Sequence, residues 1–282
     1  MVTTSLILPQ PVLRDFIHYY SLCKSGFTHV SITSPLFAHH DTSICFFLSG
    51  SPVYKTSSET VGKERIHKVS LFGLMTHCAG SITVEGNYET FIIEFRPNGF
   101  NKMFGIPAGS ICNTIFPANE VIGNCIEHFY EELLRVTGAT EMASLANKFL
   151  IGFLNRQKAV YFNDGITKIS NQLLTSIYTN NIPQYAYQAN MSMRNFERRF
   201  VEQVGTSPKL FCRLLRFNTA VKFKIIDPEK SWNQIADECG YYDDMHMIKE
   251  FKQFANASPA TLFKDNPWYM EETFTTIEQP PF

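Results

Sequence analysis

The strongest constraint on the fold is a repeat near the end of this 282-residue chain, between residues 182 and 263. Similar residues recur 51 positions apart, as Phe196 with Met247, Phe200 with Phe251, Gly205 with Asn256, and Ser207-Pro208 with Ser258-Pro259. Ala186 and Ala236 are 50 positions apart, so one turn is a residue longer than the other. A repeat of this kind indicates one supersecondary unit that is used twice.

Each copy has the pattern of a helix, a tight turn and a second helix. In the first copy Pro183 suits an opening helical turn, Asn190 suits a left-handed turn residue, and Ser192 is a good N-cap. The apolar face of the following helix comprises Met193, Phe196, Phe200 and Val204, and Gly205 suits its C-terminal end. The corresponding residues of the second copy are Gly240 at the turn, Asp243 as the cap, and Met247, Phe251 and Phe254 on the inner face.

A longer helix is predicted between the two copies. Pro208 suits its first turn, and Asp227-Pro228 ends it. Its apolar stripe comprises Leu210, Leu214, Phe217, Val221 and Ile225, and its other face carries Arg213, Arg216 and Lys222. Such a helix would fix the separation of the two units, and helices that enter successive major grooves of DNA lie roughly 34 Å apart.

This stretch resembles the DNA-binding domain of the AraC/XylS transcriptional regulators over residues 182–264. The first copy matches at Ser192-x-x-x-Phe196-x-Arg198-x-Phe200, Gly205-x-Ser207-Pro208-x-x-Phe211, Arg216 and Ala220. The second copy matches at Ile235-Ala236, Gly240-Tyr241-x-Asp243, Lys249-x-Phe251-Lys252 and Ser258-Pro259. The departures are Met245 where Ser or Thr is usual, Met247 for Phe, Lys249 for Arg and Asn256 for Gly.

The resemblance implies that double-stranded DNA is a partner and that one helix of each copy contacts it. The candidate DNA-binding residues are Arg194, Asn195, Glu197 and Arg198 in the first copy and Met245, Ile248, Lys249 and Lys252 in the second. Arginine can bond guanine bidentately and glutamate can accept from cytosine, whereas apolar groups contact only the thymine methyl. We therefore expect base discrimination from the first copy and mainly a Lys249 phosphate contact from the second; the alternative is two solvated charged faces.

The charges of the chain favour DNA contact only locally. The chain as a whole has a net charge of −1, residues 182–264 carry 12 Lys and Arg against 9 Asp and Glu, and residues 265–282 carry four acids and no base. This small local excess predicts moderate affinity for one chain, so either dimerisation or several DNA sites are needed for useful occupancy, and a homodimer is expected. The sequence has no apolar run of the length that a membrane helix needs and no secretory leader, which predicts a cytoplasmic protein without membrane contact.

The fold class expected is α+β. Residues 28–96 predict a small antiparallel β barrel or jelly-roll-like domain, from short strands at 30–33, 44–48, 53–55, 69–72, 81–84 and 90–95. A short amphipathic helix or a packed arm is expected at 12–20, flanking helices are expected at 100–104, 121–135 and 141–153, and a first helix of the C-terminal all-α domain is expected at 166–178. The domains expected are 1–155 for effector binding and dimerisation, 166–264 for DNA binding and an acidic tail at 265–282, with a polar linker at 155–165.

A second, shorter resemblance concerns the amino-terminal half. The segments Leu71-Phe72-Gly73, Phe95-Arg96-Pro97-x-Gly99 and Phe104-Gly105-Ile106-Pro107 are similar to the amino-terminal domain of one subgroup of AraC-type proteins. There such a run links the last strand to the helices. The resemblance implies a sensing or dimerising role, without identifying a ligand.

Catalytic and metal sites are not indicated. The seven cysteines are scattered without a Cys-x-x-Cys pair, which predicts free thiols rather than disulfides or a zinc ribbon. His39-His40-Asp41 precede a strand, where neighbouring side chains point to opposite faces, so we expect no metal and no other cofactor. Three functions remain: a regulator with a small-molecule effector and RNA polymerase as a partner, a ligand-independent regulator that acts through protein partners, and a cupin-like metal-dependent enzyme with accessory helices.

Overall fold

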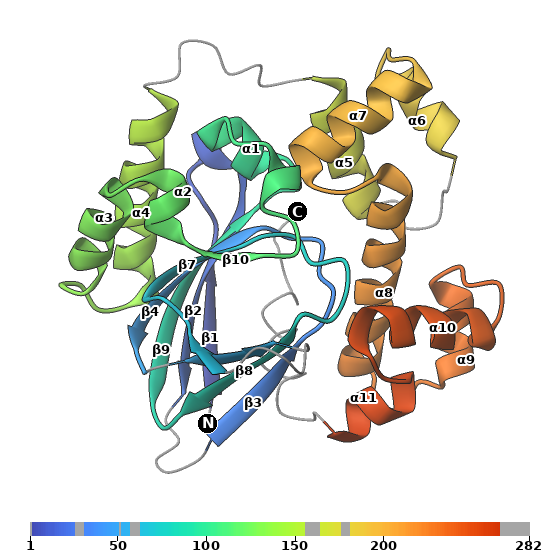
Figure 1. The fold of residues 1–282 in the computed structure, drawn as a ribbon, viewed down its shortest axis with the longest axis horizontal. Coiled ribbons are helices and arrows are strands. Elements are labelled where there is room, and N and C mark those ends of the chain that lie inside the picture. The colour runs from blue at the N-terminus through green and yellow to red at the C-terminus, as the bar shows by residue number, and fades with distance from the viewer. Residues whose placement is uncertain are drawn as a thin grey trace.

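The computed structural model describes residues 2–25, 31–50, 52–56, 63–155, 164–175 and 181–265. The linker expected at 155–165 and the acidic tail expected at 265–282 lie almost entirely outside these residues. In the described part, a β-sheet domain has helices on one side and the repeated helical units on the other (Figure 1). The α+β class and the two-part architecture predicted from the sequence are confirmed.

The described strands form two antiparallel sheets. They are β1 (Val2–Ile7), β2 (Ile17–Ser25), β3 (Ser31–Leu36), β4 (Ser43–Ser49), β5 (Val53–Thr56), β6 (Lys63–Arg65), β7 (Val69–Phe72), β8 (Gly80–Glu85), β9 (Tyr88–Phe95) and β10 (Ile115–Pro117). The larger sheet has the order β1-β2-β9-β4-β7-β10, and the smaller one has the order β3-β8-β5-β6. The predicted strands are all present, whereas β1, β2, β6 and β10 were not anticipated.

One face of the larger sheet is covered by α1 (Gly99–Phe104), α2 (Ala118–Ile122), α3 (Cys125–Leu133) and α4 (Ala139–Leu154). Alternate strand residues point to these helices because side-chain direction reverses at each residue of a strand. Phe46 of β4 meets Phe129 of α3 edge to face at 5.2 Å, and Phe129 stacks on Phe149 of α4 at 4.4 Å. The helices α3 and α4 therefore form a core with the sheet.

Two of the predicted helices are wrong. Residues 12–20 form a short 3-10 turn, η1 (Pro11–Leu13), and then enter β2, which is buried on both faces and so lacks a polar alternation. The helix predicted at 121–135 is divided into α2 and α3, because Gly123 has a φ of 94° and breaks the helical path.

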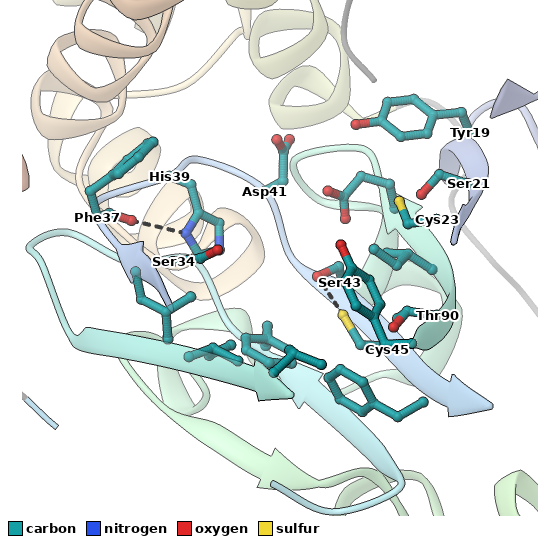
Figure 2. A pocket seen from close by; sticks show the side chains of 18 of the residues that line it. Tyr19, Ser21, Cys23, Ser34, Phe37, His39, Asp41, Ser43, Cys45 and Thr90 are labelled. Atoms are coloured by element: carbon teal, nitrogen blue, oxygen red, sulfur yellow. Dashed lines mark hydrogen bonds between the residues drawn. The ribbon is translucent and has the colours of Figure 1, made fainter. Parts of the chain in front are cut away.

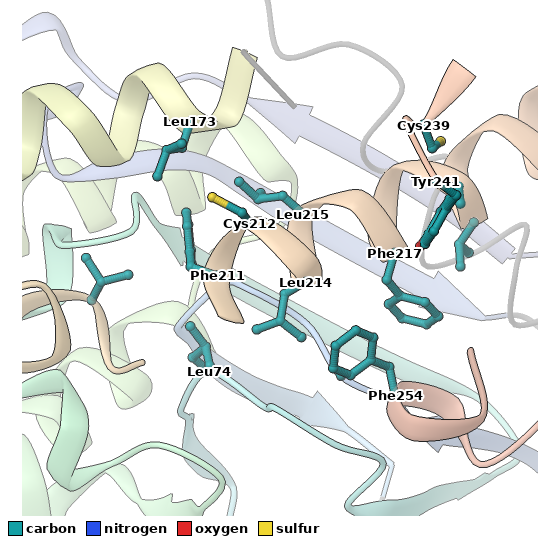
Figure 3. Close-up of a cluster of buried hydrophobic side chains, with 14 of the residues drawn as sticks. Leu74, Leu173, Phe211, Cys212, Leu214, Leu215, Phe217, Cys239, Tyr241 and Phe254 are labelled. Carbon is teal, nitrogen blue, oxygen red and sulfur yellow. The ribbon is translucent and has the colours of Figure 1, made fainter. Parts of the chain in front are cut away.

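The C-terminal part is all helical in the described residues. It comprises α5 (Gly165–Thr175), α6 (Ile182–Gln188), α7 (Met193–Val204), α8 (Pro208–Ile226), α9 (Trp232–Glu238), α10 (Asp244–Ala255) and α11 (Pro259–Asp265). The helix α8 runs between the unit of α6 and α7 and the unit of α9 and α10 (Figure 1). Figure 3 shows its buried residues Phe211, Leu214 and Phe217 in one cluster with Leu173 of α5 and Phe254 of α10.

The sheet domain and the helical part share contacts on both units. The short 3-10 helix η2 (Ala108–Ser110) packs closely on α7. A Cβ added at Gly109 would lie 3.3 Å from the Val201 carbonyl oxygen. Near the second unit, the Ala38 amide donates to the Phe254 carbonyl at 2.8 Å. Leu74 of the sheet domain joins the helical core (Figure 3).

Two glycines of the amino-terminal motif are required by close backbone approach. A Cβ on Gly73 would lie 1.8 Å from the Ile111 carbonyl oxygen, and one on Gly99 would lie 1.9 Å from that of Phe16. The first contact joins the end of β7 to the segment after η2, and the second joins the start of α1 to the residue before β2, so a side chain would separate these segments. None of the described helices is long and apolar enough to cross a membrane.

Candidate nucleic-acid interface and interior cavity

The turns of the two units have the same backbone hydrogen bonds. In the first, Asn190 N donates to Tyr187 O at 2.9 Å and Met191 N to Ala186 O at 3.0 Å. In the second, Gly240 N donates to Asp237 O at 3.0 Å, and Tyr241 N donates to Ala236 O at 2.9 Å. Asn190 and Gly240 both have a positive φ, of 54° and 65°, as expected for the turn position.

The helix α7 has a buried face and an exposed charged face. Asn195 N donates to the capping oxygen of Ser192, at 3.4 Å, while Phe196, Phe200 and Val204 are buried. Arg194, Glu197 and Arg198 are exposed, whereas Asn195 is half-buried. The side chain of Arg198 is 67% exposed; it donates to Asn195 Oδ1 at 3.0 Å and lies 3.5 Å from Glu202. Three of the four predicted contact residues therefore face solvent.

The helix α10 presents different chemistry in the same position. His246 N donates to Asp243 Oδ1 at 2.6 Å, which caps the helix as predicted. Met245, Lys249 and Lys252 are exposed, and Ile248 is half-buried. These residues lie on one side of α10, opposite Met247, Phe251 and Phe254, which are buried. The face combines apolar groups with two ammonium groups and has no arginine.

Both exposed helices are attached from behind by ion pairs at equivalent repeat positions, 199 and 250. Arg199 Nη2 lies 3.2 Å from Asp164 Oδ2, at the start of α5. Glu250 Oε1 lies 2.7 Å from Arg213 Nε and 3.1 Å from Arg216 Nη2, both on α8. Arg216 was placed on the polar outer face of its helix by periodicity, and that placement is wrong: Arg216 is buried against Glu250 and Tyr241.

The central helix sets the spacing of the units. It has 19 residues, which at about 1.5 Å per residue gives a length of roughly 28 Å. Ser207 caps its start, where Leu210 N donates to the Ser207 hydroxyl at 3.3 Å. This length is close to the roughly 34 Å between successive major grooves on one side of a duplex.

A cavity of about 270 Å³ lies between the two sheets. Alternate residues of three adjacent strands line it: Tyr19, Ser21 and Cys23 of β2, Ser43, Cys45 and Phe47 of β4, and Thr90, Ile92 and Glu94 of β9. In the sheet register Tyr19, Glu94 and Ser43 lie side by side, and Cys23, Thr90 and Phe47 lie four residues further along the strands. Leu36, Ile82 and Val84 of the smaller sheet close the opposite wall.

One end of the cavity is acidic. Glu94 lies there with Asp41 and His39 of the loop between β3 and β4, two of which are labelled in Figure 2. Burial raises the pKa of Glu94 well above its usual range, and the nearby Asp41 charge raises it further. Burial also lowers the pKa of His39, whose Nδ1 lies 3.3 Å from the Phe37 carbonyl oxygen.

The cavity also touches the helical part through Asn218 of α8, which is one of its lining residues. Asn218 Nδ2 donates to the Ala38 carbonyl at 3.1 Å, and its Oδ1 lies 3.1 Å from His40 Nδ1. Sequence reasoning missed Glu94 and Asn218 as site residues. The alternation Thr90-x-Ile92-x-Glu94 signalled an acidic residue on one sheet face, but it did not reveal which face enclosed a cavity.

The cysteines and histidines assemble no metal centre in the described residues. The seven cysteines all lie in the described residues and form no disulfide, and five of them are buried. Groups of three or more His, Cys, Asp or Glu side chains that could hold an ion are absent from the part of the chain that the structure describes. His40 Nε2 lies 3.3 Å from Asp41, while His40 also contacts Asn218, so this pair joins the loop to α8.

Comparisons with known proteins match the two halves separately. A family described as a helix-turn-helix domain matches residues 185–265, and a family described as a domain of unknown function (DUF6597) matches residues 5–117. An uncharacterised helix-turn-helix-type transcriptional regulator of Haemophilus influenzae is 37% identical over 79 residues, which are 28% of this chain and 26% of that protein. The match thus spans about a quarter of that relative's length.

Solved structures with a similar arrangement include ToxT from Vibrio cholerae. The structure from strain O395 is 10% identical and covers 96% of this chain and 98% of that one, with a TM-score of 0.47. A structure of wild-type ToxT bound to an unsaturated fatty acid is 12% identical and covers 96% and 95% of the two chains, with a TM-score of 0.48.

Proposed function

We propose that the chain is a regulator of the AraC/XylS type that binds operator DNA through α7 and α10, since its residues 185–265 match a helix-turn-helix domain family. The exposed row of Arg194, Glu197 and Arg198 on α7 carries the proposal. These side chains lie in the first half of a helix that is buried on its other face, and the N-terminal residues of a recognition helix are those that meet base edges.

The contact of α7 with the sheet domain leaves this row accessible. The turn η2 packs against the later part of α7, near Val201. Arg194 and Arg198 lie earlier in the helix and remain exposed. The central helix α8 between the two units is roughly 28 Å long, and this length supports the proposal that both units bind one side of a duplex.

Selection of bound DNA from a random pool by the full-length chain tests this proposal. We expect a site with two parts about one helical turn apart, of which one part has a strongly preferred sequence and the other a weak preference. Replacing both Arg194 and Arg198 with alanine should abolish the preference in the first part. A pool that shows no enrichment, or a preference that survives both replacements, would reject the proposed interface.

We further propose that the sheet domain, residues 1–155, binds a small effector in its interior cavity. The cavity is enclosed by both sheets and has a few polar groups at one end, which is the usual composition of a small-molecule site. The proposal also includes the earlier expectations of a homodimer, of RNA polymerase as a partner and of residues 166–264 as the DNA-binding part. Sedimentation of the chain with and without selected DNA tests the dimer.

Asn218 offers a physical route from the cavity to DNA. It belongs to α8, lines the cavity and bonds to the loop that carries His39 and Asp41. A ligand regulates only if it favours one arrangement of the two parts over another. In an Asn218→Ala variant, a ligand should still bind but should change the affinity for DNA less than it does in the natural chain. An unchanged ligand effect on DNA affinity would exclude this route.

A further inference from the structure

The polar end of the interior cavity contains hydrogen-bond acceptors and negative charge. Two carboxyl groups, those of Glu94 and Asp41, lie among the lining residues. Lysine and arginine do not occur among the described residues that line the cavity. The charge of Asp41 acts on Glu94 and repels its carboxylate, while the Ser43 hydroxyl donates a hydrogen bond to the Glu94 carboxyl group.

One oxygen of Glu94 has no partner. Glu94 Oε2 is buried and accepts no hydrogen bond, although it lies in a cavity wall. A buried polar atom without a partner costs about 1–3 kcal/mol, and native proteins seldom retain one without a reason. This orphaned acceptor beside an open volume indicates that a donor from a bound molecule completes the site.

His39 adds a third acceptor to the same end. Its Nδ1 lies 3.3 Å from the Phe37 carbonyl oxygen, which can only accept, so Nδ1 carries the proton (Figure 2). In the neutral ring, Nε2 is then an acceptor. Burial lowers the pKa of His39 and so favours the neutral ring. An ammonium group has three N–H donors and no acceptor. It therefore matches a site with three acceptors, which are the carboxyl groups of Glu94 and Asp41 and Nε2 of His39.

The cavity is small, and much of its remaining lining is apolar. Phe47, Phe72, Ile82 and Ile92 belong to this lining, together with the uncharged polar side chains of Ser21 and Thr90. Its volume of about 270 Å³ is at the lower limit of small-molecule sites, which run from roughly 300 to 1,000 Å³. A ligand with one charged end and a short hydrocarbon or a single aromatic ring suits this division.

We propose that the cavity binds a small organic cation, a protonated amine whose ammonium group lies between Glu94, Asp41 and His39 and whose apolar part lies against Phe47 and Phe72. This inference rests on the proposed effector role of the cavity and names the chemical class of the effector. A carboxylate or phosphate ligand would meet two acids without a compensating base.

Binding of the amine should also release a proton from Glu94, and this release can be measured. The titratable groups that line the cavity with Glu94 are Asp41, His39, Tyr19, Tyr88, Cys23 and Cys45. Because burial and Asp41 raise the pKa of Glu94, the empty site favours its protonated form. An arriving ammonium favours the carboxylate, so the carboxyl proton is released to the solvent while the ammonium keeps its own three protons.

The test uses isothermal titration of the full-length chain near pH 7 with three matched probes: 2-phenylethylamine, 2-phenylethanol and 3-phenylpropanoate. The same set is repeated with hexylamine, hexanol and hexanoate. We expect the amine of each set to bind at least about tenfold more tightly than the alcohol and the carboxylate to bind most weakly. Titration in two buffers of different ionisation enthalpy should show proton release with the amines and none with the alcohols.

The variants Glu94→Gln and Asp41→Asn keep the side-chain shape and remove one charge each. Glu94→Gln should weaken amine binding at least about tenfold, abolish proton release and leave alcohol binding within about threefold. Glu89→Gln is the matched control, since Glu89 lies on the same strand but pairs with Lys24 at 2.8 Å outside the cavity. If Glu94→Gln fails to fold, Asp41→Asn provides the same comparison.

Three results would overturn the inference. They are equal or tighter binding of the alcohol or carboxylate, unchanged amine binding in both folded variants, and no binding by either amine at millimolar concentration. DNA binding is measured on the same preparations. If the chain binds selected DNA but no amine, only the proposed ligand class is rejected. If it binds an amine but enriches no DNA, only the proposed DNA interface is rejected.

Discussion

The two helix-turn-helix units have opposite charges at one equivalent position. Arg199 of the first unit pairs with Asp164, and its side chain is 37% exposed. Glu250 of the second unit is 2% exposed and pairs with Arg213 and Arg216 of the central helix. The repeat thus preserves the backbone and the presence of an ion pair, while the sign of the charge and the supporting helix differ.

The units also contact the sheet domain by different means. In the first, Gln203 joins a polar network in which Asn98 Nδ2 donates to Gln203 Oε1 at 3.0 Å and Gln203 Nε2 donates to Asp164 Oδ2 at 2.7 Å. In the second, the Phe254 carbonyl accepts from the Ala38 amide. The first unit is therefore attached to the sheet domain through a side-chain network that includes the titratable Asp164, and the second through a backbone hydrogen bond.

The largest difference between the units is expected from Glu250→Gln. The change leaves Arg216 buried without its anion, and loss of one partner from a buried ion pair costs about 3–5 kcal/mol. The equivalent change Arg199→Gln should cost less than about 1 kcal/mol, because the pair is partly exposed to solvent. Urea denaturation followed by circular dichroism measures both free energies of unfolding. Equal losses would show that the burial difference has no energetic consequence.

The next largest difference between the two units is expected in their contributions to DNA binding. Arg198→Ala should weaken binding to selected DNA about 10- to 100-fold and relax the base preference in one half of the site. Lys249→Ala should weaken binding to all sequences alike and reduce the salt dependence by about one phosphate contact. Lys148→Ala on α4, which is exposed and remote from both units, is the control. A relaxed base preference with Lys249→Ala would mean that both units read bases.

Replacement of Lys249 by arginine tests the same difference in base discrimination between the two units. Arginine can form the bidentate bond to guanine that lysine cannot match in geometry, so Lys249→Arg should raise selectivity in the second half of the site by several fold. Competition between the selected site and variants of that half measures the change. If neither affinity nor selectivity changes, Lys249 does not contact DNA.

Acid should destabilise the first unit, because the charge of Asp164 contributes to its stability. Burial alone would raise the pKa of Asp164, but hydrogen bonds from Thr167 and Gln203 and the Lys102 charge hold it below its ordinary value of 3.8. Its stabilising contribution is therefore complete above pH 3.8 and is lost as the pH falls through the lowered pKa. Asp164→Asn should reduce the free energy of unfolding by about 1–3 kcal/mol at pH 7, and this difference should vanish in acid.

The control for that experiment is Asp237→Asn, an exposed residue of α9. It should change the free energy of unfolding little at any pH, since exposed charges contribute little to stability. A difference for Asp164→Asn that stays constant from pH 7 down to strong acid would show that the charge of Asp164 does not stabilise the unit.

The smallest effect is expected from the N-caps. Asp243 accepts from His246 N at 2.6 Å, whereas Ser192 accepts from Asn195 N at 3.4 Å. Replacement of either by alanine should cost about 0.5–2 kcal/mol, with the larger loss for Asp243 because its cap is charged and shorter. Thermal unfolding of the two variants gives the comparison, and an equal or larger loss for Ser192→Ala would contradict it.

Local sequence patterns predicted the helical part well. The turn residues Asn190 and Gly240, the caps Ser192 and Asp243, and the break at Asp227 depend on interactions a few residues apart, which a chain specifies without reference to its fold. The same reasoning failed at β2. That strand is buried on both faces, so it shows no alternation of period two, while Val12, Leu13, Phe16, Ile17 and Tyr20 happen to fall at helical spacing.

The sequence by itself determined the two repeated units, their inner faces and the strand-rich character of the first half, because each rests on short-range spacing. Only the tertiary structure decided that Arg216 is buried beside Glu250, that Glu94 and Asp41 share one cavity, and that Asn218 of α8 lines it. These contacts join residues that are tens to more than a hundred positions apart. Their energies depend on burial and on neighbouring charge, and both arise when the sheets and helices pack together.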